Sequence, residues 1–361
     1  MRCLFALLLF AGPTLTASAA ELVLTTGREK DGVVVISGRD TTQQLLLSDG
    51  RDRTREGRYA VEPAAIARVD DKGLLTPLKE GEATVTATWE GKRATLRVRV
   101  THQENDLPVS FVNEVVPIFT KFTCNAGGCH GKASGQNGFK LSLLGFEPGD
   151  DYEFLVKEGR GRRLLPAAPE HSLLLRKAVG QAPHGGGKKL DPASPFYRVL
   201  VRWIAQGMPE GSKDDPHVTG IEVHPAERVL ARESTQQLTV VARLSDGTSR
   251  DVTRMAQYES NQPEMAEVND TGLVSIKRLP GRPAIMARFQ SHVAVFRGTV
   301  PLGIPVTNLP TERTFIDKHV FAQWKELGLP PSPETDDATF VRRVTLDLCG
   351  RLPTIAEVRA F

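Results

Sequence analysis

Residues 81–100 read "GEATVTATWEGKRATLRVRV" and carry the clearest structural signal in the chain. Apolar and polar side chains alternate on both sides of Glu90-Gly91, as in two strands that each bury one face. A glycine accepts the positive φ that a tight hairpin turn requires. The stretch therefore predicts two antiparallel strands joined by a turn at Glu90-Gly91.

The sequence around this hairpin occurs twice. Residues 41–91 and 234–290 both contain T-Q-Q-L, then S-D-G, then a threonine after an arginine-rich stretch. Copies about 200 residues apart are separate domains rather than a solenoid, whose repeats adjoin. Many short strands with Asp-Gly turn signals predict a β-sandwich for each copy. Further along, the copies share Pro63, Ala67, Val69 and Gly73, matched by Pro263, Ala266, Val268 and Gly272.

One strand of the second copy makes a specific prediction about faces. Residues 238–243 read "LTVVAR". Successive side chains of a strand point to opposite faces. We therefore expect one face to carry Leu238, Val240 and Ala242 and the other to carry Thr239, Val241 and Arg243.

Composition limits the classes of protein that the chain can belong to. Its 361 residues are too many for one ordinary domain, and 40% apolar with 25% charged residues is typical of a globular chain. The 46 basic residues nearly cancel the 43 acidic ones, which leaves a net charge of +3. This balance gives no electrostatic reason to expect nucleic acid as a partner.

The first twenty residues have the order of a secretory signal peptide. Arg2 precedes the apolar run "LFALLLFA", then Gly12-Pro13, then the small-residue stretch "TASAA". The run is too short to span a bilayer, and no later stretch predicts a transmembrane helix. We therefore expect export to the periplasm or the cell surface. The odd number of cysteines that would remain argues against a disulfide framework; they are Cys124, Cys129 and Cys349.

The predicted fold class is multidomain: all-β sandwiches flank a mainly α domain, and a truncated α-helical segment follows. The boundaries are 1–20 for the signal peptide, 21–103 and 218–303 for the sandwiches, 106–213 for the α domain and 310–361 for the helical segment. In that last segment, helices are expected to begin near Phe315, Asp337 and Thr354, and Cys349 is expected to be buried in an apolar helical run. No helix-stop signal precedes Phe361, so we expect the chain to be a fragment of a longer protein.

The middle segment contains the motif C-x4-C-H at Cys124, Cys129 and His130. In a c-type cytochrome, two thiols form thioethers with the haem vinyl groups and the adjacent histidine is the proximal iron ligand. The usual spacing is C-x-x-C-H, so this loop is two residues longer. The small residues 126–128 permit the bulge that a longer loop needs. Upstream, an apolar face predicts a helix that ends at the motif, formed by Val112, Val115, Val116, Phe119 and Phe122.

A second iron ligand is expected just before the next helix. Residues 194–209, "SPFYRVLVRWIAQGMP", predict that helix, with Ser194 as N-cap and Gly207 at its end. His184 lies in the glycine-rich loop before it, where small cytochromes present the distal ligand. We therefore predict His184 as the sixth ligand, with Met208 as the runner-up. Two histidines would lower the reduction potential relative to a Met/His pair.

Other chemistries fit the same residues. A zinc ion could take Cys124, Cys129 and either His130 or His184. A plain disulfide between the two cysteines would also suit an exported protein. In either case, or with no cofactor, the chain would be a cell-surface adhesion or scaffold protein. A basic cluster could pair with haem propionates or remain a solvated surface; it contains Arg160, Arg162 and Arg163.

The sequence shows no catalytic constellation, and whether the chain is an enzyme stays uncertain. It contains no Ser-His-Asp set, P-loop or dinucleotide loop that we can identify. Three carboxylates near the C-terminus lie on a predicted helix whose apolar pattern explains their spacing; they are Asp336, Asp337 and Asp347.

Several stretches resemble known families. The two sandwich segments resemble the bacterial Ig-like group 2 domain, with Val69, Gly73 and the strand 81–85 matching its pattern and the second copy keeping Gly281, Ala284 and Ile285 in looser spacing. Such domains are mostly spacers or adhesive modules, and we expect spacers here. The stretch "VVPIFTKFTCNAGGCHGKASGQNGFKLSLLGFEPGDDYEFL" resembles the cytochrome c-like module of large planctomycete surface proteins.

In those proteins the module lies beside Ig-like domains and precedes a domain of unknown function. The opening signature of that domain, "D-x-x-F-x-R-R-x-x-L-D-L-x-G-R-L-P", matches residues 337–353. The resemblance implies covalent haem c and electron transfer with a redox partner that the sequence does not identify. It also implies an association with the cell surface or its polysaccharides.

Overall fold

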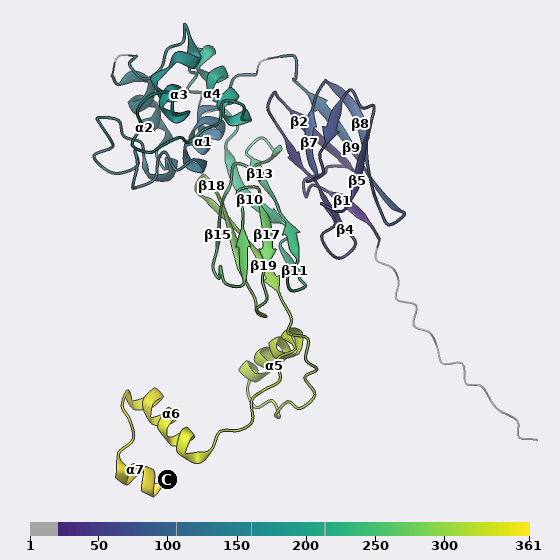
Figure 1. The fold of residues 1–361 in the computed structure, drawn as a ribbon, viewed down its shortest axis with the longest axis vertical. Helices are drawn as coiled ribbons and strands as arrows, with labels where there is room; N and C mark the ends of the chain where they lie inside the picture. The colour runs from purple at the N-terminus through teal and green to yellow at the C-terminus, as the bar shows by residue number, and fades with distance from the viewer. Residues whose placement is uncertain (1–20, 106, 160, 213) are drawn as a thin grey trace, which may run out of the picture.

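The computed structural model describes residues 21–361 except 106, 160 and 213. The predicted signal peptide, residues 1–20, lies outside the described residues. Figure 1 shows two β domains side by side, an α domain beside the first and above the second, and three further helices below. We refer to the first sandwich (β1–β9), the α domain (η1–α4) and the second sandwich (β10–β19).

The first sandwich confirms the predicted hairpin. β8 (Gly81–Trp89) pairs antiparallel with β9 (Lys92–Thr101), and Glu90 and Gly91 both have positive φ. The main sheet has the order β2-β9-β8-β5, with β2 (Val33–Ser37) parallel to β9 and β5 (Arg58–Glu62) antiparallel to β8. The opposing sheets contain β1 (Val23–Thr25), β3 (Gln43–Gln44), β4 (Leu46–Ser48), β6 (Ala67–Val69) and β7 (Leu74–Pro77).

The second sandwich repeats this architecture. Its main sheet has the order β11-β19-β18-β15, with β11 (Glu227–Val229) parallel to β19 (His292–Thr299). β18 (Ala284–Phe289) and β15 (Gln257–Ser260) complete that sheet. The opposing sheets have the orders β12-β17-β16 and β10-β13-β14 and consist of β12 (Thr235–Gln237), β17 (Leu273–Ile276), β16 (Ala266–Val268), β10 (Val218–His224), β13 (Thr239–Leu244) and β14 (Ser249–Asp251).

The repeated threonine has the same role in both sandwiches. Thr54 Oγ1 accepts a hydrogen bond from Leu47 N at 3.1 Å, and Thr253 Oγ1 accepts one from Val240 N at 2.9 Å. A tyrosine hydroxyl then donates to the carbonyl of each threonine at 2.8 Å; the donors are Tyr59 and Tyr258. The sequence repeat is therefore also a repeat of hydrogen bonds.

The two sandwiches pack directly against each other through a reciprocal contact. Asp251 Oδ2 accepts a hydrogen bond from Gln44 N at 2.5 Å and one from Gln43 Nε2 at 3.0 Å. At the matching position of the other copy, Asp52 Oδ2 accepts a hydrogen bond from Gln237 N at 2.6 Å. We call this contact the clasp; it comprises Gln43, Gln44, Asp52, Arg55, Gln237, Asp251 and Arg254.

The arginines of the clasp repeat the same symmetry. Arg254 Nη1 donates to Gln44 Oε1 at 2.9 Å, and Arg55 Nη2 lies 3.4 Å from Gln237 Oε1. Because matched residues meet in both directions, the interface has the form of a two-fold symmetric dimer within one chain. Burial of the two clasp carboxyls raises their pKa values, and the amide and hydroxyl donors around each carboxyl offset part of that cost.

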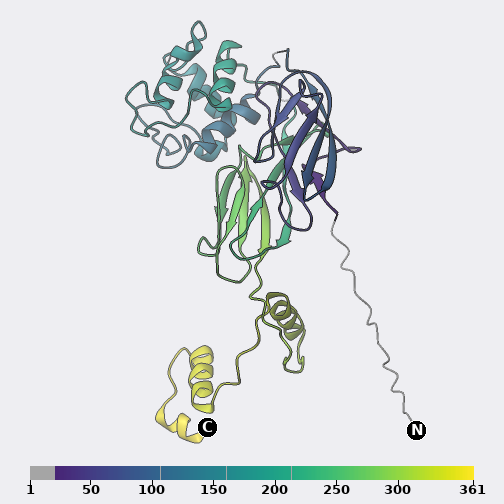
Figure 2. The same cartoon turned by 45° about the vertical axis from the view of Figure 1, so that its right-hand side comes forward.

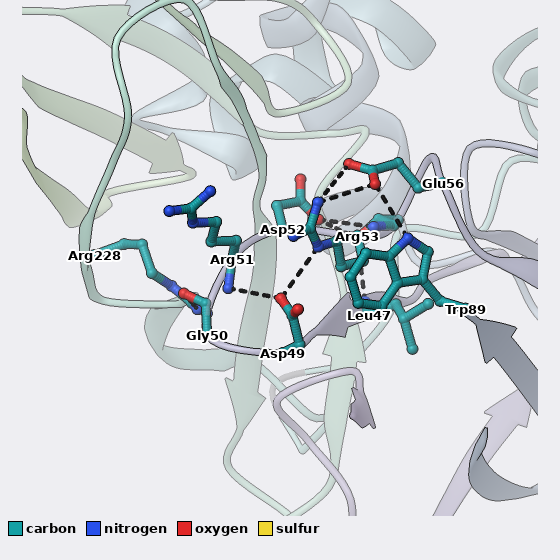
Figure 3. Close-up of polar contacts among 10 residues, drawn as sticks. Leu47, Asp49, Gly50, Arg51, Asp52, Arg53, Glu56, Trp89 and Arg228 are labelled. Carbon is teal, nitrogen blue, oxygen red and sulfur yellow. Dashed lines mark hydrogen bonds and ion pairs between the residues drawn. The ribbon is translucent and has the colours of Figure 1, made fainter. Parts of the chain in front are cut away.

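Figure 3 shows the turn that carries Asp52. Asp49 Oδ1 accepts from Arg53 Nε at 3.1 Å, and the Arg53 guanidinium lies 4.1 Å from the centroid of the Trp89 ring. Glu56 accepts from both Arg53 and the Trp89 indole. From the second sandwich, Arg228 Nη1 reaches the Gly50 carbonyl at 2.8 Å. The turn is thus bonded both within the first sandwich and to the second sandwich.

Packing between the sandwiches covers both faces of β13. Leu238, Val240 and Ala242 lie in the core of the second sandwich, and Thr239 and Val241 on the opposite face are fully buried as well. Thr239 Oγ1 donates to Thr26 O of the first sandwich at 3.0 Å, which shows that this face meets the first sandwich. A single strand pattern cannot reveal a second domain that covers the polar face.

The α domain consists of short helices around one apolar core. They are η1 (Phe111–Val115), α1 (Val116–Lys121), η2 (Leu143–Gly145), α2 (Pro148–Tyr152), η3 (Glu153–Lys157), η4 (Pro169–His171), α3 (Leu173–Ala178) and α4 (Pro195–Ala205). Trp203 is completely buried and stacks on Phe111 with 5.4 Å between ring centroids. The helix predicted to follow Ser194 is confirmed as α4, since Ser194 Oγ accepts from Tyr197 N and Gly207 has positive φ.

The C-terminal helices begin where the sequence predicts. They are α5 (Phe315–Leu327), α6 (Asp337–Cys349) and α7 (Ile355–Ala360), strung below the second sandwich (Figures 1 and 2). Their apolar side chains are mostly exposed, with Phe315 at 77% and Leu348 at 80%. The prediction that Cys349 is buried is wrong: the thiol is exposed, because α6 buries only Val341 among the described residues.

Candidate functional site

The C-x4-C-H loop begins where α1 ends. Thr123 has a φ of 59°, which turns the chain, and Cys124 N donates to Phe119 O at 2.8 Å. The loop then closes on itself, since His130 N donates to Cys124 O at 3.0 Å and Cys129 N donates to Ala126 O at 2.9 Å. Residues 124–130 therefore form a compact turn on the end of the predicted helix.

His130 and His184 lie opposite each other. Their ring centroids are 6.3 Å apart, and their planes differ by 9°. His130 Nδ1 lies 2.9 Å from Phe139 O, and His184 Nδ1 lies 2.9 Å from Gly187 O. A ring nitrogen that faces a carbonyl carries the proton, which leaves Nε2 of the same ring as the basic nitrogen. Neither Nε2 has a hydrogen-bond partner among the residues that the structure describes.

Each of the two rings has its Nδ1 on a backbone carbonyl. A carbonyl that accepts from the far nitrogen is the usual outer partner of a metal-bound histidine. Burial lowers the pKa of His130, and the neighbouring His184 acts in the same direction. Burial thus favours the neutral form of His130, which is the form that binds metals.

The two thiols of the motif differ in environment. Cys124 packs against the core of the α domain, and burial raises the pKa of its thiol to about 11. Cys129 is half-buried and follows the open residues Gly127 and Gly128. A Cβ atom on Gly128 would meet nothing within 4 Å, so this side of the loop has free space. Both cysteines are free thiols, which differs from the disulfide alternative.

Two free thiols on one short loop and two facing imidazoles are the donor types that the haem group implied by the motif would need. A structural zinc site needs four ligands arranged around one ion. Across residues 21–361 apart from 106, 160 and 213, no group of three or more His, Cys, Asp or Glu side chains is placed to hold a metal ion.

Other predicted residues have different roles. Arg163 donates to the carbonyls of Phe154, Glu158 and Gly138 and lies 4.7 Å from the centroid of the Phe139 ring, so it braces the fold beside the site. Arg160 lies outside the described residues. Met208 packs against the core of the α domain, and its carbonyl accepts from the Tyr152 hydroxyl at 2.8 Å.

Sequence reasoning missed the residues that hold the loop from outside. Asn125, inside the motif, is 1% exposed and donates through Nδ2 to Thr120 Oγ1 at 2.8 Å. Gly131 has no room for a side chain, because a Cβ atom there would lie 2.0 Å from Asn125 O. A polar residue between two motif cysteines and a glycine directly after the histidine are the available signals, but neither indicates its partner.

The chain thus combines two sandwiches with an α domain that carries paired histidines and thiols. Residues 33–99 and 217–278 match the family described as bacterial Ig-like domain (group 2), so both sandwiches are Ig-like. Residues 315–361 match a family described as PSCyt2, protein of unknown function (DUF1549). Neither match includes the α domain.

A curated relative and several solved structures are similar to parts of the chain. An S-layer-related protein of Niallia circulans is 46% identical over 54 residues, which are 15% of this chain and 3% of that protein. The crystal structure of the S-layer protein SbsC is 12% identical, with 81% of this chain and 29% of that chain covered and a TM-score of 0.21. A SusE-like surface-located polysaccharide-binding protein from Bacteroides thetaiotaomicron is 10% identical, with 78% and 34% covered and a TM-score of 0.17.

Within the part of the chain that the structure describes, no helix has the length and apolar character needed to cross a bilayer.

Proposed function

We propose that the α domain binds haem covalently through Cys124 and Cys129, with His130 and His184 as axial ligands, and that the chain is an exported electron-transfer protein. The observation that carries this proposal is the pair of parallel imidazoles, each with Nδ1 on a carbonyl and Nε2 without a partner in the described chain. Bound haem would supply one-electron chemistry at its iron.

The chain's own residues would attach and orient the group. Cys124 and Cys129 would hold the group through thioether bonds, which a thiol forms by addition without consuming an oxidant, and His130 and His184 would bind its iron. Phe139 O and Gly187 O hold the two imidazoles in the tautomer that leaves Nε2 basic. The Phe139 ring, 4.6 Å from the His130 ring between centroids, excludes water from one side.

The test is expression of the full chain with a haem-attachment system, followed by intact mass under denaturing conditions and visible spectroscopy. We expect one tetrapyrrole adduct that survives denaturation and a low-spin, six-coordinate spectrum. Cys124→Ala with Cys129→Ala should remove the adduct. His184→Ala should keep the adduct and lose six-coordination, whereas His171→Ala, at an exposed histidine of the same domain, should change neither. A colourless wild-type protein of unmodified mass refutes the proposal.

A second candidate is a cell-surface scaffold or adhesion protein without haem. Two matched Ig-like domains that pack through the clasp support it, as does the S-layer-related relative. The comparisons favour this candidate more directly, because neither family match includes the α domain. Retention of the haem-free chain on purified cell envelopes or on cell-surface polysaccharide would support this candidate, and absence of binding would count against it.

A further inference from the structure

The end of α1 lies against the second sandwich. Lys121, the last residue of α1, is 7% exposed in its side chain. Its Nζ donates to Ala256 O at 2.8 Å and to Asp270 O at 2.9 Å, and Asp270 Oδ1 lies 3.3 Å away. Burial lowers the pKa of this ammonium group, so its contacts offset a real desolvation cost.

A second contact caps the same helix end. Gln257 Nε2 of the second sandwich donates to Thr120 O at 2.8 Å. The last carbonyls of a helix have no partner within it, so a side chain from another domain can satisfy one. Thr123 N donates to the same carbonyl at 3.0 Å, which starts the turn into Cys124.

The capped residue is also bound to the motif itself. Thr120 Oγ1 accepts from Asn125 Nδ2 at 2.8 Å, and Asn125 O accepts from Leu144 N at 3.0 Å. A continuous set of hydrogen bonds therefore runs from Gln257 through Thr120 to Asn125, the residue between Cys124 and the rest of the loop. Thr120 O keeps Thr123 N as a donor when Gln257 is replaced, so the loss of Gln257 removes the link between the domains and weakens the hold on this buried carbonyl.

We infer that Lys121 and Gln257 are positioning residues for the C-x4-C-H loop, so that the second Ig-like domain is part of the site rather than a spacer. The inference rests on the proposed function for its bearing on haem. The mechanical claim concerns the chain alone: the second sandwich holds residues 124–130 in the conformation that presents Cys124 and His130. Neither residue touches the ligands directly.

The experiment compares two glutamines of the same domain. Gln290 Nε2 also donates to the α domain, at 3.1 Å to Val112 O and to Asn113 Oδ1, at the far end of η1. We expect Gln257→Leu to raise both the amide exchange rate of residues 124–130 and the alkylation rate of Cys124 in the haem-free chain by about fivefold. Gln290→Leu should leave both rates unchanged. Equal effects of the two variants, or no effect of Gln257→Leu, overturn the inference.

Variants of Lys121 test the inference independently of Gln257. Lys121→Met should raise the same rates, and Lys121→Arg should restore most of the protection, because an arginine can still donate to both carbonyls. If Lys121→Arg behaves like Lys121→Met, the positioning role of Lys121 is refuted. In haem-loaded protein, Gln257→Leu should shift the reduction potential while Gln290→Leu does not. A wild type without haem refutes the proposed function, while the exchange and alkylation results still decide the inference.

Discussion

Replacement of Asp251 by alanine should uncouple the two Ig-like domains. The carboxylate accepts two hydrogen bonds across the interface, from Gln44 N at 2.5 Å and from Gln43 Nε2 at 3.0 Å. At about 1.5 kcal/mol for each of these buried hydrogen bonds, we expect a loss of about 3 kcal/mol. With a urea dependence of about 2 kcal/mol per M, the midpoint for the paired domains should fall by about 1.5 M.

The matched control is Asp246→Ala. Asp246 lies in the turn between β13 and β14, where its Oδ1 accepts from Thr248 N and Thr248 Oγ1, and among the described residues it makes no hydrogen bond or ion pair with the first sandwich. The structure also ranks a second variant. Asp52 accepts one hydrogen bond across the interface, from Gln237 N at 2.6 Å, so Asp52→Ala should cost about half as much, about 1.5 kcal/mol.

The assay is pulsed amide exchange with mass spectrometry along a urea series, which reports each domain separately in the full chain. In the wild type, peptides from β9 and from β19 should lose protection together. In Asp251→Ala they should lose it at different urea concentrations. If Asp251→Ala lowers the midpoint no more than Asp246→Ala, the clasp does not couple the domains and the reasoning is wrong.

Two further predictions follow from the titrating groups. At pH 8, iodoacetamide should label Cys129 before Cys124. The Cys124 thiol, with a pKa of about 11, carries about 100-fold less thiolate than it would at its ordinary pKa of 9.0. Equal labelling rates of the two cysteines in the haem-free chain would contradict this prediction. The second concerns the clasp, where burial raises the pKa of Asp251 above its unfolded value. The folded state then holds the proton more tightly, so this contribution to stability is complete below the unfolded pKa and is lost as pH rises through the folded pKa. Urea titration should therefore show that wild type exceeds Asp251→Asn in unfolding free energy by more at pH 4 than at pH 7. If this excess instead grows with pH, the predicted direction of the pH dependence is wrong.

Elements with a strong local pattern were predictable from the sequence. The alternation of 81–100 gave the β8–β9 hairpin, and Ser194 with Gly207 bounded α4, because strand faces and helix caps depend on neighbours within a few residues. The sequence placed His184 in the loop before α4, and the structure brings its ring opposite that of His130. The carbonyl partners of the two rings were not predictable, because Phe139 and Gly187 meet the rings only after the chain folds.

Contacts between domains could not be predicted from local pattern. The sequence repeat includes T-Q-Q-L and an aspartate two residues before each matched threonine, Thr54 and Thr253. Nothing in one copy, however, shows that it packs against the other. The burial of Thr239 and Val241 likewise comes from packing against the first sandwich, which the strand pattern alone does not show. The exposure of Cys349 is the opposite case, in which an apolar helical pattern is present and the described residues supply little to cover it.

The domain contacts also bear on why an α domain would sit between two Ig-like domains. Asp40 of the first sandwich bonds Arg198 and Arg202 on α4 at 2.7 Å each, while Lys121 ties α1 to the second sandwich. The clasp then joins the two sandwiches to each other, so the three bodies form a closed ring of contacts (Figure 2). A domain on a flexible tether needs no partly buried ion pairs, since each one carries a desolvation cost. The ring instead gives the paired histidines one orientation relative to both sandwiches.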